Sequence, residues 1–97
     1  MNVHVIINPA SGKDPVDAEM IRSKLGASGS AFRIALTEPD TGPGVLARKA
    51  VGEGADLVVA AGGDGTVLGT AEGLIGTGVP LGVIPEGTAN VFAAEMG

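Results

Sequence analysis

The residues of this 97-residue chain that could do chemistry gather in Gly62-Gly63-Asp64-Gly65-Thr66, where three glycines in four positions surround one carboxylate. Glycine lets the backbone approach a ligand closely, and successive N–H groups at the start of a helix form a site for anions. A tight turn between a strand and a helix would explain part of this pattern. Three glycines, an acid and a threonine exceed what a turn requires, so the stretch predicts a phosphate-binding loop.

Asp64 is the only acid inside the Gly-rich core of a candidate loop. An aspartate among phosphate-binding glycines can coordinate a metal ion, contact a nucleotide or accept the proton of a hydroxyl group. The plainer alternative is a carboxylate that only caps local N–H groups. The residues alone leave both interpretations open.

Two other loops carry weaker patterns. Asn8–Lys13 supplies hydroxyl, amide and ammonium donors, but it lacks the GxxxxGK[ST] spacing of a Walker A loop. Pro85–Asn90 is a turn with a glycine and hydrogen-bonding side chains. Taken alone, each of these loops is explained equally well as an ordinary connection.

Several other kinds of site are excluded. His4 is the only histidine, and its apolar segment predicts a core or edge position rather than a ligand. Because that histidine is expected in the core, no Ser-His-Asp triad is predicted. With no second histidine and no cysteine, the chain has no His-rich zinc site and no disulfide. It also has no GxGxxG dinucleotide fingerprint.

The charges are divided unevenly along the chain. All six cations lie within residues 1–49, whereas residues 50–97 contain six acids and no Lys or Arg. The second half therefore cannot hold a nucleic-acid backbone, which requires clustered cations. An anion bound there must be held by backbone N–H groups, a helix dipole or a bridging metal. No apolar run approaches the ~20 residues that span a bilayer, and no signal peptide is visible, so the cytoplasm is expected.

These loops must be positioned by regular elements, and four apolar segments alternate with helical patterns. Strands are predicted over Val3–Ile7, Ala31–Leu36, Leu57–Ala61 and Leu81–Ile84, and helices over Pro15–Leu25, Gly44–Val51, Val67–Ile75 and Ala89–Met96. The near-continuous apolarity of the strands is typical of parallel strands covered on both faces. The alternation predicts one α/β domain with a mostly parallel sheet and its ligand site at the carboxyl ends of the strands.

The helical patterns also predict which side chains face the core. In the helix over Gly44–Val51, the inward residues are expected to be Leu46, Ala47, Ala50 and Val51. In the helix over Val67–Ile75, they are expected to be Val67, Leu68, Ala71, Leu74 and Ile75. Thr66 is expected to be the N-cap of the latter helix, because its hydroxyl can accept a hydrogen bond from an unpaired N–H.

Together, three segments resemble the diacylglycerol kinase catalytic-domain family, which includes bacterial lipid kinases and sphingosine kinases. The segments are Ile7–Lys13, Gly62–Val67 and Gly82–Ala93. They follow the order of the family's motifs and span almost the whole chain. GGDGT is shared with NAD kinases and phosphofructokinases, whereas the NPxSG and PxGTxNxFA patterns are typical of the lipid kinases.

The resemblance implies a three-layer α/β/α nucleotide-binding domain of the phosphofructokinase and NAD kinase type over residues 1–97. It also implies transfer of the γ-phosphoryl group from ATP, with Mg²⁺, to a lipid hydroxyl of diacylglycerol or sphingoid type. Asp64 would be the catalytic residue beside the transferring phosphate, and no residue is assigned as a metal ligand. The residues implied in nucleotide binding are Asn8, Ser11, Gly12, Lys13, Gly62, Gly63, Gly65, Thr66, Gly87, Thr88 and Asn90.

The chain departs from the family pattern at three positions. Many members have Asn-Glu where this chain has Leu68-Gly69, and Asp where it has Val91. Ribose or metal contacts from these positions are therefore not assigned. The family's enzymes also add a β-rich C-terminal domain that helps to bind lipid and is absent from this chain. The chain is thus expected to be the nucleotide-binding half of an enzyme, inactive or nearly so by itself.

Two alternatives to a lipid kinase stay open. One is a stand-alone nucleotide-binding or regulatory module without catalysis, and the other is a phosphotransferase of the NAD kinase type. The expected partners are a nucleotide and, through the missing domain, a lipid, and nucleic acid is not expected. Transient membrane contact and homo-oligomer formation stay open, and the lipid acceptor is not identified.

Overall fold

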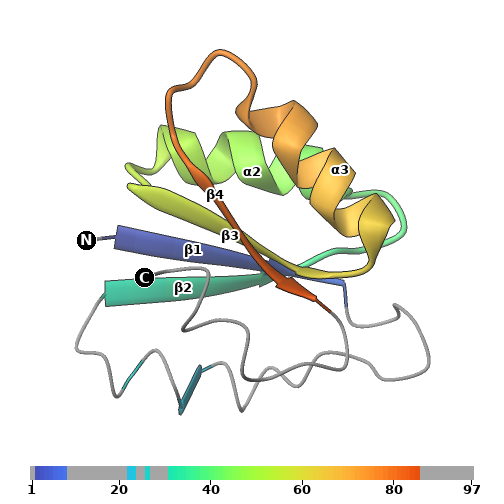
Figure 1. The fold of residues 1–97 in the computed structure, drawn as a ribbon, viewed down its shortest axis with the longest axis horizontal. Helices are drawn as coiled ribbons and strands as arrows, with labels where there is room; N and C mark the ends of the chain where they lie inside the picture. The colour runs from blue at the N-terminus through green and yellow to red at the C-terminus, as the bar shows by residue number, and fades with distance from the viewer. Residues whose placement is uncertain (1, 9–21, 24–25, 27–30, 86–97) are drawn as a thin grey trace.

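The computed structural model describes residues 2–8, 22–23, 26 and 31–85 (Figure 1). Its elements are β1 (Asn2–Ile7), β2 (Ala31–Leu36), α2 (Pro43–Gly52), β3 (Leu57–Gly62), α3 (Asp64–Leu74) and β4 (Leu81–Pro85). All four predicted strands and the helix predicted over 44–51 are present, with bounds within one residue of the prediction. The helix predicted over Ala89–Met96 lies outside the described residues.

The four strands form one sheet in the order β2-β1-β3-β4, and every neighbouring pair is parallel. Their carboxyl ends therefore point to the same side of the molecule (Figure 1). At this end, Ile7 of β1 lies between Leu36 of β2 and Ala61 of β3, and Ala61 in turn lies beside Ile84 of β4. The predicted α/β fold with a parallel sheet is confirmed.

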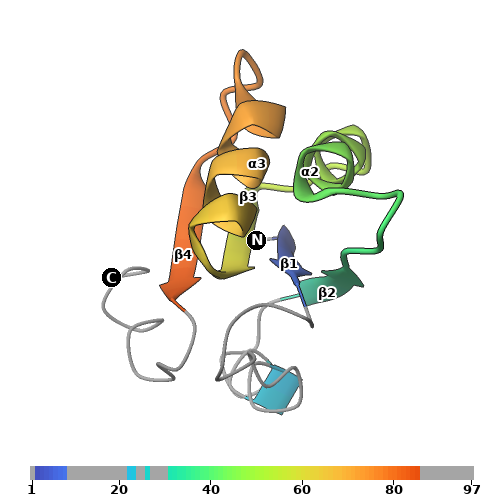
Figure 2. The same cartoon turned by 90° about the vertical axis from the view of Figure 1, so that its right-hand side faces the viewer.

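Helical residues lie on both sides of the sheet. α2 and α3 cover one face, whereas the helical residues 22, 23 and 26 lie on the other side in both views (Figures 1 and 2). The strand order explains this division. The step from β1 to β2 crosses the sheet in the opposite direction to the step from β2 to β3, so right-handed connections must run over opposite faces. The arrangement is the three-layer one that was expected.

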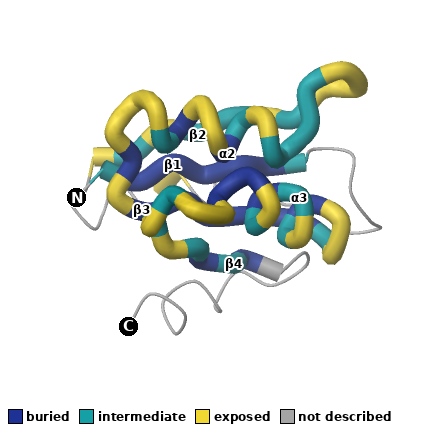
Figure 3. Tube along the Cα trace, turned by 90° about the horizontal axis from the view of Figure 1, so that it is seen from above, coloured by how far each residue is buried: buried dark blue, intermediate teal, exposed yellow. Residues whose placement is uncertain are grey.

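The core is divided by the sheet into two clusters. The cluster under α2 and α3 contains Ile6, Ala47, Ala50, Ala55, Val58 and Leu74. The cluster on the other face contains Val3, Val5, Ile7, Leu57, Val59, Ala61 and Ile84. β3 is buried along its whole length and β1 along nearly all of it (Figure 3), which accounts for their nearly continuous apolar sequences.

α2 and α3 pack so closely that glycine is required between them. A Cβ on Gly73 would lie 2.5 Å from the carbonyl oxygen of Gly44 and 2.9 Å from the Cβ of Ala47. A Cβ on Gly69 would lie 2.5 Å from Cγ of Pro43. These separations are shorter than van der Waals contact, so a larger residue at either position would push the two helices apart.

The inward face predicted for α3 is wrong in part. Leu68 and Ile75 are 64% and 72% exposed, respectively, and the buried residues of the helix are Thr66, Thr70, Gly73 and Leu74. These four positions also repeat with helical spacing, but three of them are small or polar. At Gly73 the close approach of α2 explains the small residue. Thr70 is buried with its hydroxyl group donating to the carbonyl oxygen of Thr66, so its polar group is satisfied within the helix. For α2, by contrast, the prediction is confirmed: Ala47 and Ala50 are buried, and Leu46 and Val51 pack against them.

The start of α3 also differs from the prediction. The helix begins at Asp64 rather than Val67, and its N-cap is Gly63 rather than Thr66. Thr66 is buried in the first turn, where its carbonyl oxygen accepts a hydrogen bond of 2.7 Å from the Thr70 hydroxyl. The Gly-rich stretch was expected to form a loop, but most of it is helical because the turn is completed within Gly62 and Gly63.

Replacing Gly73 with alanine is expected to lower the free energy of unfolding by about 1–3 kcal/mol, the usual cost of overpacking. The opposing gain in helix propensity is no more than about 1 kcal/mol. Gly52→Ala is the matched control, because a Cβ there meets nothing within 4 Å at the end of α2. Urea denaturation measures the free energy of unfolding of both variants and of the wild type. Equal stability of the two would contradict the close approach of the helices.

His4 occupies the buried position that its sequence predicts, with 6% of its surface exposed. Burial lowers the pKa of the imidazole, and the charge of Arg33 lowers it further, while Glu53 acts in the opposite direction. The unfolded chain therefore takes up the proton at a higher pH than the folded chain does. The resulting stabilisation is complete above the unfolded pKa, about 6.5, and is lost as the pH falls.

Between pH 7.5 and 5.5, the free energy of unfolding is expected to decrease with a slope of at most about 1.4 kcal/mol per pH unit, the limit for one proton. Chemical denaturation at a series of pH values measures this slope. His4→Phe should flatten the profile in this range, since the chain has no other histidine. If the free energy of unfolding depended on pH equally steeply in the variant, a group other than His4 would cause the pH dependence.

Candidate functional site

The carboxyl ends of β1, β3 and β4 place three chemically interesting segments at one edge of the sheet. Asn8 directly follows β1, and its N–H donates to the carbonyl oxygen of Ala61 in β3 at 3.4 Å. Gly62, the last residue of β3, is paired with Pro85, the last residue of β4. The three predicted loops therefore start side by side, at the edge where parallel α/β sheets bind their ligands.

The chain turns from β3 into α3 over only two residues. Gly62 has a φ of 153°, a backbone conformation that residues with a side chain rarely adopt. Gly63 is extended and serves as the N-cap, and its carbonyl oxygen accepts hydrogen bonds of 3.1 Å from the N–H groups of Thr66 and Val67. Both glycines thus serve the geometry of the turn.

The start of α3 presents unpaired hydrogen-bond donors. Within the part of the chain that the structure describes, the N–H groups of Gly63, Asp64 and Gly65 make no backbone hydrogen bond. The first N–H groups of a helix have no acceptor within the helix, and the helix dipole adds roughly half a positive charge at this end. This geometry fits an anionic ligand in the half of the chain that has no Lys or Arg.

Gly65 is the glycine that the fold does not explain. It is exposed, its φ is not positive, and a Cβ there would meet nothing within 4 Å. Glycine in a helix costs about 1 kcal/mol relative to alanine, so its presence needs another reason. Without a side chain, the backbone at the start of α3 is open to close approach by a ligand such as a phosphate group.

Asp64 lies in the first turn of α3 and is exposed. Its carboxylate forms no hydrogen bond or ion pair with any residue that the structure describes, so the interpretation as a local cap is not supported. A carboxylate and a phosphate repel each other unless a cation or a proton lies between them, and Mg²⁺ is commonly held by one or two carboxylates together with phosphate oxygens. No group of three or more His, Cys, Asp or Glu side chains suited to a metal occurs among the described residues.

Half of the implied site residues, counting the catalytic Asp64 with the binding residues, can be placed. Asn8, Gly62, Gly63, Asp64 and Gly65 lie at the edge just described, and Thr66 is close behind them with only 4% of its surface exposed. The remaining ones lie outside the described residues: Ser11, Gly12, Lys13, Gly87, Thr88 and Asn90. Their roles stay predictions.

A fourth loop at the same edge was not identified from the sequence. It follows β2, where Thr37 donates to the carbonyl oxygen of Ile7 at 2.9 Å. Glu38 and Thr41 then exchange two backbone hydrogen bonds of 3.0 Å each. With Asp40, this turn adds two exposed carboxylates at the edge. The turn over residues 37–41 contains no glycine, so its position directly after a predicted strand was the main available signal.

The departures from the family pattern in α3 have structural explanations. Leu68 points outward, and Gly69 lies against Pro43 in the contact between the two helices. Gly69 is therefore used for packing, where the side chain of an Asn or a Glu would not fit.

Among the described helices, none combines the length and apolarity needed to cross a membrane.

A comparison with protein families finds a match over nearly the whole chain. The model of the family described as "Diacylglycerol kinase catalytic domain" matches residues 2–97. A diacylglycerol kinase of Staphylococcus aureus is 36% identical over 96 residues, which cover 95% of this chain and 30% of that protein. An uncharacterised protein of Synechocystis sp. is 37% identical over 107 residues, covering 97% of this chain and 24% of that protein. The chain thus spans less than a third of the length of these relatives.

Solved structures share the fold. A crystal structure of a diacylglycerol kinase from Bacillus anthracis superposes with a TM-score of 0.69 at 29% identity, covering 96% of this chain and 35% of that one. The solution structure of a phosphate-loop protein, at 21% identity and a TM-score of 0.61, covers 99% of this chain and 86% of that one, and it supports the fold alone. With the family match over nearly all of its residues, the chain belongs to the diacylglycerol kinase catalytic domain family.

Proposed function

We propose that this chain is the ATP-binding part of a lipid kinase that transfers the γ-phosphoryl group of ATP to a lipid hydroxyl. Family membership supports phosphoryl transfer, and the names of the relatives favour diacylglycerol as the acceptor. The single observation that carries the proposal is that the N–H groups of Gly63, Asp64 and Gly65 and the Asp64 carboxylate beside them have no partner among the described residues.

Phosphoryl transfer depends mainly on positioning and on charge neutralisation, and the edge of the sheet offers both. The N–H groups at the start of α3 bind and orient phosphate oxygens, and Gly65 lets them approach. Asp64 holds Mg²⁺ beside the phosphates or accepts the proton of the attacking hydroxyl. Bound Mg²⁺ neutralises phosphate charge, which this cation-free half of the chain cannot do with side chains.

The acceptor lipid is proposed to bind mainly to protein outside this chain. The relatives are several times longer than this chain of 97 residues, and the activity in their names belongs to the whole proteins. The chain by itself is therefore expected to bind ATP·Mg²⁺ weakly and to phosphorylate little or no lipid. Binding without any turnover, even in a full-length relative carrying this domain, would favour a regulatory module instead.

Asp64→Asn is expected to weaken ATP binding in the presence of Mg²⁺ by roughly tenfold or more, because a charge-assisted contact contributes about 1.5–3 kcal/mol. If Asp64 holds the metal, binding measured with EDTA should be the same in both proteins. Isothermal titration with ATP and with ADP, with and without Mg²⁺, measures these affinities.

Glu72→Gln is the matched control for Asp64→Asn, since Glu72 is an exposed acid farther along the same helix. Its affinity for ATP·Mg²⁺ should equal that of the wild type. A wild-type protein that binds neither nucleotide would contradict the proposed function. If both variants lost the same ATP affinity, the effect of Asp64→Asn would come from the loss of one negative charge and not from a contact of Asp64 with the ligand.

Gly65→Ala is expected to change stability and binding in opposite directions. The free energy of unfolding should rise by up to about 1 kcal/mol, because the Cβ has open space and alanine favours the helix. ATP binding should weaken, because the methyl group occupies the place where a phosphate approaches the backbone. Gly52→Ala should stabilise the protein without changing ATP binding. Unchanged ATP affinity in Gly65→Ala would remove Gly65 from the site.

A further inference from the structure

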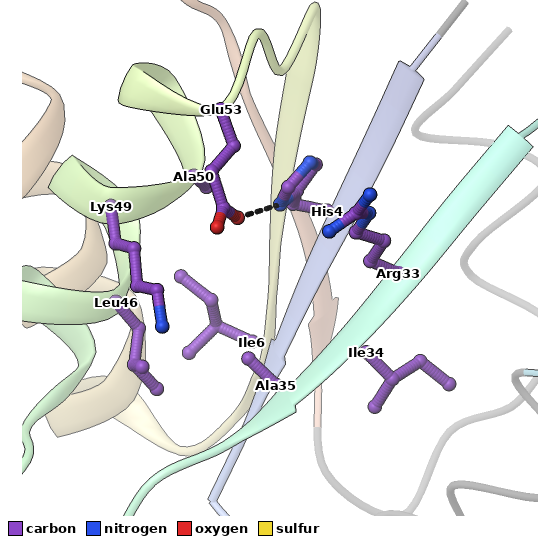
Figure 4. A pocket seen from close by; sticks show the side chains of 9 residues that line it. All are labelled: His4, Ile6, Arg33, Ile34, Ala35, Leu46, Lys49, Ala50 and Glu53. Carbon is purple, nitrogen blue, oxygen red and sulfur yellow. Dashed lines mark ion pairs between the residues drawn. The ribbon is translucent and has the colours of Figure 1, made fainter.

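Among the described residues, three polar or charged side chains are buried: His4, Thr66 and Thr70. His4 lies beside a cavity of about 210 Å³ between α2 and the strands β1 and β2, with its Nδ1 4.0 Å from Oε1 of Glu53 (Figure 4). Thr70 lies on the buried side of α3 and is the one of the three with no exposed surface. Any effect of its hydroxyl group on a ligand must therefore pass through the protein.

Packing does not explain the hydroxyl group of Thr70. A valine has nearly the same shape and helix propensity, and it would place a second methyl group in this buried position. The hydroxyl group donates to the carbonyl oxygen of Thr66 at 2.7 Å. Such a bond to the carbonyl group four residues earlier satisfies the hydroxyl group, but it tends to bend a helix rather than to stabilise it. The presence of a threonine here therefore needs a reason beyond the stability of α3.

The carbonyl group of Thr66 begins a chain of hydrogen bonds that leads to the start of α3. The peptide group that contains this carbonyl also contains the N–H of Val67, which donates to the carbonyl oxygen of Gly63 at 3.1 Å. The peptide group of that second carbonyl in turn contains the N–H of Asp64, which makes no backbone hydrogen bond among the described residues. The chain thus ends at one of the three donors to which a phosphate group is proposed to bind.

Two physical effects carry the influence of the Thr70 hydroxyl group along this chain. A peptide group is planar, so a bond that fixes the direction of its C=O also fixes the direction of its N–H. A hydrogen bond to the carbonyl oxygen also polarises the peptide group and strengthens the next hydrogen bond by roughly 10–30%. Both effects orient and strengthen the N–H of Asp64 as a donor before a ligand binds.

We propose that Thr70 is a positioning residue for phosphate binding, whose hydroxyl group orients and polarises the N–H of Asp64 through the peptide groups described above. The inference rests on the proposed function, because it gives this N–H a phosphate oxygen of ATP as its acceptor. A second bond supports the route, since the N–H of Thr66 also donates to the carbonyl oxygen of Gly63 at 3.1 Å. Two donors therefore hold this carbonyl group, and its direction sets that of the Asp64 N–H.

Amide proton shifts measure the chain of hydrogen bonds in the ligand-free protein. Thr70→Val removes the hydroxyl group and fills the same space, whereas Thr70→Ser keeps the hydroxyl group without the methyl group. In Thr70→Val, the amide protons of Val67 and Asp64 are expected to move upfield, because both N–H groups become less polarised. In Thr70→Ser, both protons should keep their wild-type shifts. Heteronuclear NMR spectra of the 97-residue chain measure these shifts.

ATP binding and stability are expected to respond differently in these two variants. Thr70→Val should weaken the binding of ATP·Mg²⁺ about two- to threefold, because one charge-assisted hydrogen bond becomes weaker, while Thr70→Ser should bind as the wild type does. Thr70→Ser should nevertheless be the less stable of the two, because loss of the methyl group leaves a void at a fully buried position. Isothermal titration measures the affinities, and urea denaturation measures the free energies of unfolding.

Thr77→Val is the matched control. The hydroxyl group of Thr77 donates to the carbonyl oxygen of Leu74 at the same distance of 2.7 Å, but at the opposite end of α3 from the proposed site. Whatever its stability, this variant should keep the wild-type affinity for ATP·Mg²⁺ and the wild-type amide shift of Asp64.

If ATP affinity followed stability, so that Thr70→Ser lost more affinity than Thr70→Val, Thr70 would have a structural role only and the proposal would be overturned. An unchanged Asp64 amide shift or an unchanged ATP affinity in Thr70→Val would also overturn it, as would an equal loss of affinity in Thr77→Val. Each of these results leaves the proposed function intact as long as the wild type binds ATP. A wild type that binds no ATP would contradict the proposed function and the role of Thr70 together.

Discussion

The parallel pairing of β3 with both β1 and β4 is the constraint on which the rest of this structure depends. β3 is buried over its whole length, and its register sets Ala61 between Ile7 and Ile84. Because the three strands run in the same direction, the segments that follow them begin at one edge. Without this pairing, Asn8, Asp64 and Pro85 would have no common site, since they are distant in the sequence.

The glycines of this chain answer to different physical requirements. Gly62 provides a backbone conformation at a sharp turn, and Gly69 and Gly73 allow two helices to approach. Gly65 satisfies neither need, and it is the glycine at which ligand binding is the best physical explanation. A high glycine content can therefore reflect turns, close helix packing or ligand binding. Only the local geometry of each glycine shows which of these applies.

The strands and α2 could be predicted from the sequence because their buried positions carry apolar side chains, such as those of Val58 and Val59. The inward face of α3 could not, because small or polar residues such as Thr70 and Gly73 are buried there, and at Gly73 the close approach of α2 leaves no room for a side chain. The Gly-rich stretch and Asp64 were singled out from their residue types and spacing. The structure places them where β3 ends and α3 begins, and their role in binding stays a prediction. The cavity at His4 was not found, because it depends on the register of β1 with β2 and on a helix that crosses above them.

The contact between Gly44 and Gly73 has a mechanical consequence for the other end of α3. A helix held backbone to backbone against its neighbour can neither slide along its axis nor rotate without separating from it. The donors in its first turn are thus fixed relative to the sheet before any ligand arrives. Such preorganisation lowers the entropy lost on binding, so an interhelical contact without any polar side chain would help to set the affinity of the anion site proposed at the start of α3.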